Sequence, residues 1–300
     1  DDAVVGLVIA CAGRTFSAGA DIREFNAPVK GPSLPVLIDE IEASKKPVVV
    51  ALHGTTLGGG FELAIGCHYR IADEGTRVGL PEVHLGLIPG AGGTQRLPRL
   101  IGAEAAIEAI TTGRHIPAPE ALELGALDEV VESDVIASAI SAARRLSSSN
   151  KVKRTCSREV DPESIPDGIF QKSKVALAKR RRGFNAPPAA VDAIEWACST
   201  PSRDGLKRER ELSSQLKASV QSKAQRHLFF AERLALKIPD IPKETVIRPV
   251  ESVGVIGAGT MGAGIAVCLL NADLTVVLVE TKQDALDQGI AQIAKSLGRD

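Results

Sequence analysis

Two β-branched, apolar runs are each followed at once by a glycine-bearing segment, and no other feature limits the possible folds of this chain as strongly. VVGLVIA (4–10) precedes GRTFSAGADI, and KPVVVALHG (46–54) precedes LGGGFELAIGC (57–67). Continuous runs of this kind are typical of strands buried on both faces of a sheet. Glycines after such a strand allow a tight turn into a helix. We therefore expect an α/β fold built from strand–turn–helix units.

The alternation of strands and helices continues through the first half of the chain. Further strands are expected at 69–73, 77–82 and 127–131. Helices are expected at 34–44, 103–112, 118–124 and 134–148, and a glycine-rich turn leads into another within 90–102. This order favours a largely parallel sheet.

The sequence changes in character after residue 150. Residues 167–236 carry helical patterns, with a long helix expected within 209–238, and IPDIPKETVIRP (238–249) has the prolines of a linker. A new α/β pattern begins at SVGVIGAG. We therefore divide the chain into a first α/β part at 1–150, a helical extension and linker at 151–245, and a second α/β part at 246–300.

Charge and composition exclude several classes of protein. Lys and Arg number 36 against 37 Asp and Glu, so no overall field favours nucleic acid or an anionic membrane. The five cysteines form no CxxC pair, which indicates reduced thiols in an intracellular, soluble protein. The histidines lack metal-ligand spacing, so no metal is expected. No apolar run is long enough to span a bilayer, and no signal peptide is visible.

Both ends of the sequence indicate a piece of a longer protein. The chain begins with DDAVVGLVIA, without an initiator Met and almost directly in a strand. It stops at AKSLGRD, in or just after a helix. We expect some functional parts of the parent protein to lie outside this sequence.

The stretch LGGGFEL joins a buried strand to the start of a helix, where backbone N–H groups have no partner within the helix. Glycines let a ligand approach such donors closely, and the donors suit an oxygen that gains negative charge during a reaction. We expect Gly59 to be the donor, with Glu62 close to it on the helix. A tight packing turn with Glu62 on the surface fits the same stretch, so both interpretations stay open here.

Two other stretches favour a catalytic site. SAGADI (17–22) also follows a buried strand and can supply a second backbone donor. Glu82, in LPEVHLGLIPGAGG, supplies a second carboxylate, although a solvated carboxylate at the end of a strand is the alternative. Two backbone donors and two carboxylates can together polarise a carbonyl group and move protons at its α and β carbons.

These stretches resemble the crotonase (enoyl-CoA hydratase/isomerase) superfamily. SAGADI, LGGGFELAIGCHYRIA and GLPEVHLGLIPGAGGTQRLPRLIG occur in the family's order, and the resemblance covers roughly residues 4–135. It implies a ββα superhelix that binds acyl-CoA thioesters and stabilises an enolate-like oxyanion with two backbone N–H groups. The early crotonase strands that help to contact CoA would precede this sequence.

The resemblance also implies a role for five residues. Ala20 and Gly59 would supply the two oxyanion-binding N–H groups, and Gly90 matches the position whose N–H helps to hold a water molecule. Glu62 and Glu82 match the two acids that deprotonate the water and protonate the α-carbon. Because both acids are retained, we expect hydration of a trans-2-enoyl-CoA. Isomerisation between Δ3 and Δ2 enoyl-CoA stays open, since it passes through the same enolate.

A second glycine motif lies near the end of the chain. SVGVIGAGTMGAG contains Gly257, Gly259 and Gly262 in GxGxxG spacing, after an expected strand and at the start of a helix. LTVVLV follows as a second strand, and Glu280 stands at its end, at the distance typical of a dinucleotide-binding unit. An acid there would bind the ribose hydroxyls of NAD and disfavour NADP. A βαβ turn that binds no nucleotide is the alternative.

This segment resembles the start of the NAD-binding domain of 3-hydroxyacyl-CoA dehydrogenases. A crotonase part, a helical linker and the first part of a Rossmann domain in one chain resemble the multifunctional fatty-acid β-oxidation enzymes. Residues 252–300 provide only two strands and two helices, and all five histidines lie before them. The family's dehydrogenase uses a His–Glu pair from farther along, so we expect this chain not to oxidise 3-hydroxyacyl-CoA.

The resemblance further implies acyl-CoA substrates, a monomer or small homo-oligomer, and a location in a peroxisome or in bacterial cytoplasm. Two other hypotheses remain open: an isomerase-only crotonase-fold enzyme, and a catalytically silent scaffold that binds acyl-CoA or a nucleotide. The two retained glutamates favour an enzyme over a scaffold.

Overall fold

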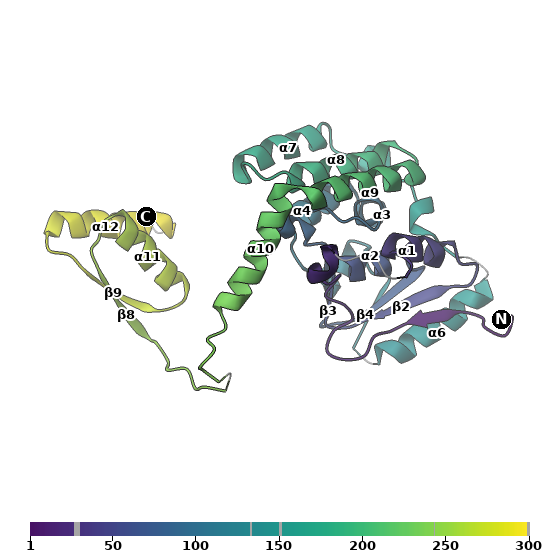
Figure 1. Cartoon of the computed structure of the whole chain (residues 1–300), viewed down its shortest axis with the longest axis horizontal. Coiled ribbons are helices and arrows are strands. Elements are labelled where there is room, and N and C mark those ends of the chain that lie inside the picture. The colour runs from purple at the N-terminus through teal and green to yellow at the C-terminus, as the bar shows by residue number, and fades with distance from the viewer. Residues whose placement is uncertain (27–30, 133, 150–151, 243, 299–300) are drawn as a thin grey trace. The chain divides into compact units, whose positions relative to one another are not determined.

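A computed structural model describes residues 1–26, 31–132, 134–149, 152–242 and 244–298 (Figure 1). The chain divides into two compact units, Asp1–Leu236 and Lys237–Asp300. No helix in the described part of the chain combines the length and the apolarity needed to cross a bilayer.

A four-stranded parallel sheet forms one layer of the first unit. Its strands lie in the order β1 (Leu7–Ile9), β2 (Val48–Leu52), β4 (Tyr69–Asp73) and β7 (Glu129–Val131). β2 is buried on both faces, as its apolar run predicts. Helix α6 (Val135–Ser149) covers one face, where its alanines pack on Val49, Ala51 and Ile71.

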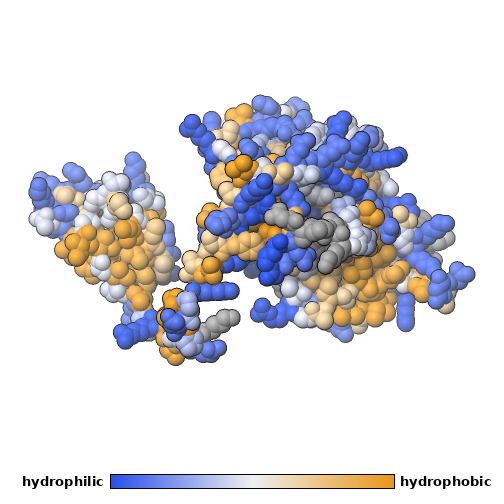
Figure 2. Space-filling model, viewed as in Figure 1, coloured by the Kyte–Doolittle hydropathy of each residue, from blue (hydrophilic) through white to orange (hydrophobic). Residues whose placement is uncertain are grey.

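The expectation of a strand buried on both faces at 4–10 is wrong in two respects. β1 contains only Leu7–Ile9, and Val5 and Leu7 are exposed. β1 pairs only with β2 among the described strands, so it lies at the edge of the sheet and fewer side chains cover it. Figure 2 shows the resulting apolar surface around β1 and α6.

A smaller sheet directly follows β2. It consists of β3 (Thr55–Leu57), β5 (Arg77–Gly79) and β6 (Ile116–Pro117), with β3 and β5 parallel and β6 antiparallel. The chain changes direction between β2 and β3 at Gly54, whose φ of +61° is one that glycine adopts without strain. The second sheet is therefore formed by the segments that lead into the glycine-rich stretches.

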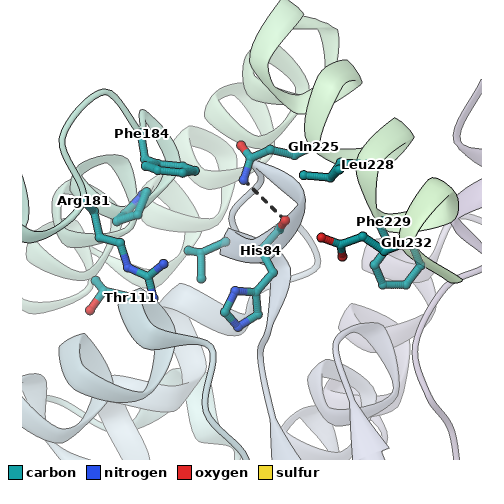
Figure 3. A pocket seen from close by; sticks show the side chains of 10 residues that line it. His84, Thr111, Arg181, Phe184, Gln225, Leu228, Phe229 and Glu232 are labelled. Carbon is teal, nitrogen blue, oxygen red and sulfur yellow. Dashed lines mark hydrogen bonds between the residues drawn. The ribbon is translucent and has the colours of Figure 1, made fainter. Parts of the chain in front are cut away.

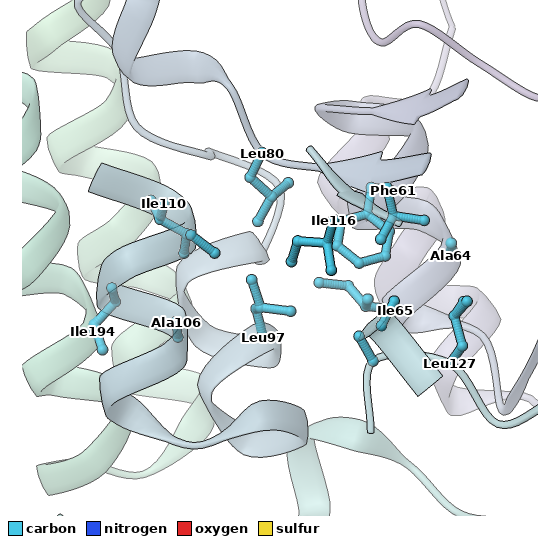
Figure 4. Close-up of a cluster of buried hydrophobic side chains, with 14 of the residues drawn as sticks. Phe61, Ala64, Ile65, Leu80, Leu97, Ala106, Ile110, Ile116, Leu127 and Ile194 are labelled. Atoms are coloured by element: carbon cyan, nitrogen blue, oxygen red, sulfur yellow. The ribbon is translucent and has the colours of Figure 1, made fainter. Parts of the chain in front are cut away.

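Helices enclose the other face of the main sheet. They are α1 (Leu34–Ala43), α2 (Gly59–Gly66), α3 (Gly93–Ile101), α4 (Ala103–Thr112) and α5 (Ala118–Glu123). Short 3-10 helices stand at Ile22–Asn26 (η1), Glu82–Leu85 (η2), Thr155–Ser157 (η3) and Pro162–Ser164 (η4). The main core lies between these helices and the sheets and includes Phe61, Leu97 and Ile110 (Figure 4).

Four helices follow in the second half of this unit: α7 (Ile169–Arg180), α8 (Ala186–Ser199), α9 (Ser202–Ala218) and α10 (Val220–Ala235). The run expected to contain a long helix holds the end of α9 and the whole of α10. The break falls at Ser219, which leaves the helical region and whose side chain accepts a hydrogen bond from Ser222 N. A serine cap of this kind starts a new helix.

The second unit contains one β–α–β–α sequence within its described residues. β8 (Ser252–Ile256) and β9 (Thr275–Val279) pair in parallel, connected by α11 (Thr260–Asn271) and followed by α12 (Gln283–Ser296). Every second residue of β9 is exposed, including Val277 and Val279. One face of this sheet is therefore open, and it forms apolar surface in Figure 2.

Candidate active site

The two glycine-bearing loops predicted to supply backbone donors lie side by side. Leu57 N donates to Ser17 O over 2.9 Å, which ties the SAGADI loop to β3. A Cβ atom placed on Gly59 would lie 4.0 Å from Ala20 N, so the backbones of these two residues adjoin. Gly59 begins α2 and has no helical partner for its N–H. Ala20 N donates no hydrogen bond to any other described residue.

The three glycines of LGGG are required for different reasons. Gly58 has φ +52°, which glycine adopts without strain. A Cβ atom on Gly59 would lie 2.7 Å from Leu34 Cδ2, and one on Gly60 would lie 2.5 Å from Ser17 Cβ. A larger residue at Gly60 would push α2 away from the SAGADI loop, and one at Gly59 would displace the end of the Leu34 side chain.

Glu62 is buried in the first turns of α2, with only 4% of its surface exposed. The alternative that places it on the surface is therefore wrong. Its Oε1 accepts hydrogen bonds from Ala91 N at 2.7 Å and Gly93 N at 2.9 Å. Burial raises the pKa of the Glu62 carboxyl, while these two bonds and the Arg96 charge oppose the rise.

Glu82 lies near Glu62 but in a different environment. The strand expected at 77–82 ends at Gly79, and Glu82 begins η2 instead. Its Oε1 would be 3.1 Å from a Cβ atom on Gly58, and its Oε2 is shielded from solvent without a hydrogen-bond partner among the described residues. A solvated strand-end carboxylate is thus excluded. Burial, and then the charge of Glu62, raise the pKa of Glu82 well above its ordinary value.

Gly90 lies just before the turn that binds Glu62. A Cβ atom there would be 2.4 Å from Ser213 Oγ of α9, so the position accommodates no side chain. Its N–H donates no hydrogen bond within the described part of the chain. A role of this N–H in holding water stays a prediction.

A third carboxylate, Glu209 of α9, was not predicted from the sequence. It is fully buried and accepts hydrogen bonds from Gly92 N at 2.6 Å and Thr94 N at 2.8 Å. Its one sequence signal is its position, because it shares the buried face of α9 with Leu206 and Leu216. A charged residue at a core position needs compensation. The site therefore includes a residue beyond 150.

A buried ion pair stabilises the helices next to the candidate site. Arg96 Nη2 of α3 lies 2.9 Å from Glu42 Oε2 and 3.0 Å from Asp39 Oδ1, both on α1. Arg96 Nη1 also donates to Ala91 O. Arg96 thus connects α1 to the turn that holds Glu62.

A cavity of about 510 Å³ lies beside η2 and is separate from the three carboxylates. Figure 3 shows His84, Arg181 and Glu232 around it, with Gln225 Nε2 donating to His84 O over 3.3 Å. None of Glu62, Glu82 and Glu209 lines this cavity. Burial, and then the Arg181 charge, lower the pKa of His84. No hydrogen bond joins His84 to Glu62 or Glu82 within the described residues.

The glycine motif of the second unit has the geometry of a dinucleotide-binding turn. Gly257 has φ +98°, and a Cβ atom on Gly262 would lie 1.8 Å from Gly257 O. Gly259 precedes the first residue of α11. Ala258 N donates to Glu280 Oε2 over 3.0 Å, and this bond and those from Thr281 lower the pKa of Glu280 to about 2.

These residues fit NAD. Gly257, Gly259 and Gly262 leave the backbone at the start of α11 open to a pyrophosphate, and the Glu280 carboxylate stands beside that turn. The described residues hold no cluster of His, Cys, Asp and Glu that could bind a metal ion.

Comparisons with known proteins agree with this architecture. The family model "Enoyl-CoA hydratase/isomerase" matches residues 1–164, and "3-hydroxyacyl-CoA dehydrogenase, NAD binding domain" matches residues 252–300. The crystal structure of an enoyl-CoA hydratase/isomerase from Pseudoalteromonas atlantica T6c superimposes with a TM-score of 0.56 at 25% identity, covering 77% of this chain and 81% of that one.

Two similar proteins contain both parts. The chain is 45% identical to the "Peroxisomal bifunctional enzyme" of Danio rerio, over 100% of this chain and 42% of that protein. It is 35% identical to the "Glyoxysomal fatty acid beta-oxidation multifunctional protein MFP-a" of Brassica napus, over 98% of this chain and 42% of that protein. The chain thus spans less than half the length of these relatives. It is a homologue of the multifunctional β-oxidation enzymes that carries the start of an NAD-binding domain, and it belongs to the enoyl-CoA hydratase/isomerase family.

Proposed function

We propose that the first unit adds water across the double bond of a trans-2-enoyl-CoA to give a 3-hydroxyacyl-CoA. The observation that carries this proposal is the pair of carboxylates of buried Glu62 and half-buried Glu82, beside two adjoining backbone N–H groups. Hydration needs one group that accepts a proton and another that donates one. The names of the relatives support fatty-acid β-oxidation as the setting.

In the proposed reaction, the thioester oxygen lies against the N–H groups of Ala20 and Gly59. Glu62 takes a proton from water while the water oxygen bonds to C3, and the electrons of the double bond move toward the thioester oxygen. The two N–H groups stabilise the resulting enolate oxygen. Glu82 then gives its proton to C2. Glu62 has gained one proton and Glu82 has lost one, so an exchange between them resets the site.

The surroundings of the two acids support this division of roles. Glu62 accepts two N–H bonds, which favour its charged form and suit a base. The Oε2 atom of Glu82 has no such bond within the described residues, and the neighbouring Glu62 charge favours its protonated form. Glu82 is therefore suited to act as the acid.

Isomerisation between Δ3 and Δ2 enoyl-CoA is the second candidate. Removing a proton from C2 of a 3-enoyl-CoA gives a dienolate whose oxygen the same N–H pair would stabilise, and return of a proton to C4 gives the 2-enoyl-CoA. Glu82 in its ionised form would remove the proton from C2. Both reactions would use the same N–H pair and the same two acids, and the charge of Glu62 acts on Glu82.

In the parent protein we propose that the second unit contributes to NAD binding, with Glu280 at the ribose hydroxyls. Bound NAD would supply a hydride acceptor for oxidation of the 3-hydroxyacyl product. The names of the relatives also support a peroxisomal location. Oxidation itself would need residues outside this chain.

The decisive experiment follows the enone absorbance of crotonyl-CoA with the full chain. Hydration is expected to remove this absorbance, and a trans-3-enoyl-CoA is expected to produce it if isomerisation also occurs. Binding of CoA without either change would overturn the proposal in favour of a silent acyl-CoA-binding scaffold. Isomerisation without hydration would instead identify an isomerase-only enzyme.

A further inference from the structure

Glu209 is a buried carboxylate that the proposed reaction does not use. No part of its surface is exposed, and no described Lys, Arg or His side chain forms a salt bridge with it. Its charged neighbours are instead Glu62 and, within range of its field, Glu82. A carboxylate in such surroundings is unfavourable unless hydrogen bonds compensate it.

The compensation comes from the turn that also holds Glu62. Four consecutive residues, Ala91 to Thr94, point their backbone N–H groups alternately at two carboxylates. Ala91 N and Gly93 N donate to Glu62 Oε1, at 2.7 and 2.9 Å. Gly92 N and Thr94 N donate to Glu209, at 2.6 and 2.8 Å, and the Thr94 hydroxyl donates to it as well.

Because the donors alternate, the same backbone segment holds both carboxylates, and a movement of that segment affects both. Gly92 has φ +106°, so the turn adopts a conformation that few residues tolerate. All four residues of the turn are buried, and an N–H group without a partner is unfavourable there. Loss of the acceptor for Gly92 and Thr94 would therefore favour rotation of the turn, and that rotation would move the donors that hold Glu62.

Contacts between α9 and α3 show that Glu209 is held in place. A Cβ atom on Gly205, one turn before Glu209, would lie 2.1 Å from Gln95 Oε1. Gln95 Nε2 in turn donates to Ala193 O at 2.7 Å and to Thr94 Oγ1 at 3.0 Å. The helix that carries Glu209 is thus packed closely against the start of α3.

We propose that Glu209 is a positioning residue: by accepting the N–H groups of Gly92 and Thr94, it fixes the turn whose other two N–H groups orient the Glu62 carboxylate. This inference rests on the proposed role of Glu62 as base. It makes α9, from the helical half of the first unit, a necessary part of the hydratase site.

The experiment compares Glu209→Gln with Glu211→Gln in the full chain. Both remove one carboxylate from α9, but Glu211 is exposed and stands outside the site. For Glu209→Gln we expect kcat for crotonyl-CoA hydration to fall at least about tenfold with KM changed less than about threefold, since a displaced base slows chemistry more than binding. An unchanged kcat in this variant, with an active wild type, would overturn the inference and leave the proposed function standing.

Amide hydrogen exchange gives a measurement that does not depend on turnover. Glu209→Gln should accelerate exchange at Ala91 and Gly93, the donors to Glu62, as well as at Gly92 and Thr94. Acceleration confined to Gly92 and Thr94 would overturn the inference. A wild type without hydratase activity would refute the proposed function separately, and the exchange at Ala91 and Gly93 would still decide whether Glu209 positions Glu62.

If Glu209→Gln fails to fold, Thr94→Val provides the test. It removes one of the three donors to Glu209 and keeps the volume of the side chain. We expect a smaller fall in kcat, about threefold, with the same unchanged KM and the same faster exchange at Ala91 and Gly93. Wild-type kcat and exchange in Thr94→Val would overturn the inference.

Discussion

The Oε1 atom of Glu62 accepts a hydrogen bond from the backbone nitrogen of Ala91 over 2.7 Å, although 29 positions separate the two residues in sequence. A backbone donor cannot be removed by side-chain substitution, although a change in the turn that carries it can displace it. The other oxygen, Oε2, accepts no hydrogen bond from the described residues. Glu62 is therefore anchored at one oxygen and free to meet a water molecule at the other.

Glu62→Gln and Glu82→Gln should each lower kcat for crotonyl-CoA hydration by about 10²–10⁴-fold, the usual contribution of a positioned acid or base. Both amides have nearly the volume of the acids, so the far-UV circular dichroism should not change. Glu104→Gln, an exposed acid on α4, is the control and should keep wild-type turnover. Near-normal turnover in either site variant would contradict the assignment of that residue.

Sequence patterns predicted the strand and the helix around Glu62 well, because both lie in contiguous motifs. β2 and the start of α2 follow directly from KPVVVALHG and LGGG. Glu209 was not predicted, since its acceptor role depends on packing between α9 and α3 across 115 or more positions. The exposed face of β1 was missed for the same reason, because an apolar run does not show which neighbours cover a strand.

The buried carboxylates should make the first unit less stable as the pH rises. Burial, and then the Glu62 charge, raise the pKa of Glu209 from 4.5 to about 8. Between these values the folded protein binds more protons than the unfolded chain, so its free energy of unfolding falls with increasing pH. Glu209→Gln removes this titration, and we expect a shallower dependence of the urea midpoint between pH 5 and 8.

The same urea series on Glu211→Gln separates a specific effect from a general one. This exposed position should retain the wild-type slope against pH. Equal slopes in wild type and Glu209→Gln would show that Glu209 titrates normally in the folded state.

The contact between α1 and α2 predicts a coupled pair of substitutions. A Cβ atom on Gly66 would lie 2.4 Å from Ile38 Cγ2, and Ile38 is fully buried. Gly66→Ala should therefore destabilise the first unit by about 1–3 kcal/mol through overpacking, and Ile38→Ala by about 2–5 kcal/mol through a cavity. In the double variant the new methyl group occupies part of that cavity, so the double variant should lose less stability than the sum of the two single losses.

Denaturant titration of the four proteins in this cycle measures the coupling. Gly264→Ala in α11 serves as the control, because a Cβ atom there meets nothing within 4 Å. It should not destabilise the second unit. If the losses in free energy of unfolding of Gly66→Ala and Ile38→Ala are strictly additive in the double variant, the two helices adjust to the new methyl group without strain.

The cysteines should differ widely in their reactivity toward a thiol reagent at pH 8. The thiolate is the reactive form, and burial raises the pKa of Cys67 to about 12. Its thiolate fraction at pH 8 should then be lower than that of an ordinary thiol by more than about a thousandfold.

Cys268 is exposed and should react first in the folded protein, whereas Cys67 should react only on unfolding. Cys268→Ser should abolish the fast phase and leave the slow phases unchanged. Rapid modification of Cys67 in the folded protein would mean that the end of α2 opens readily. The Ile38–Gly66 contact, which closes that end of the helix, argues for slow reaction.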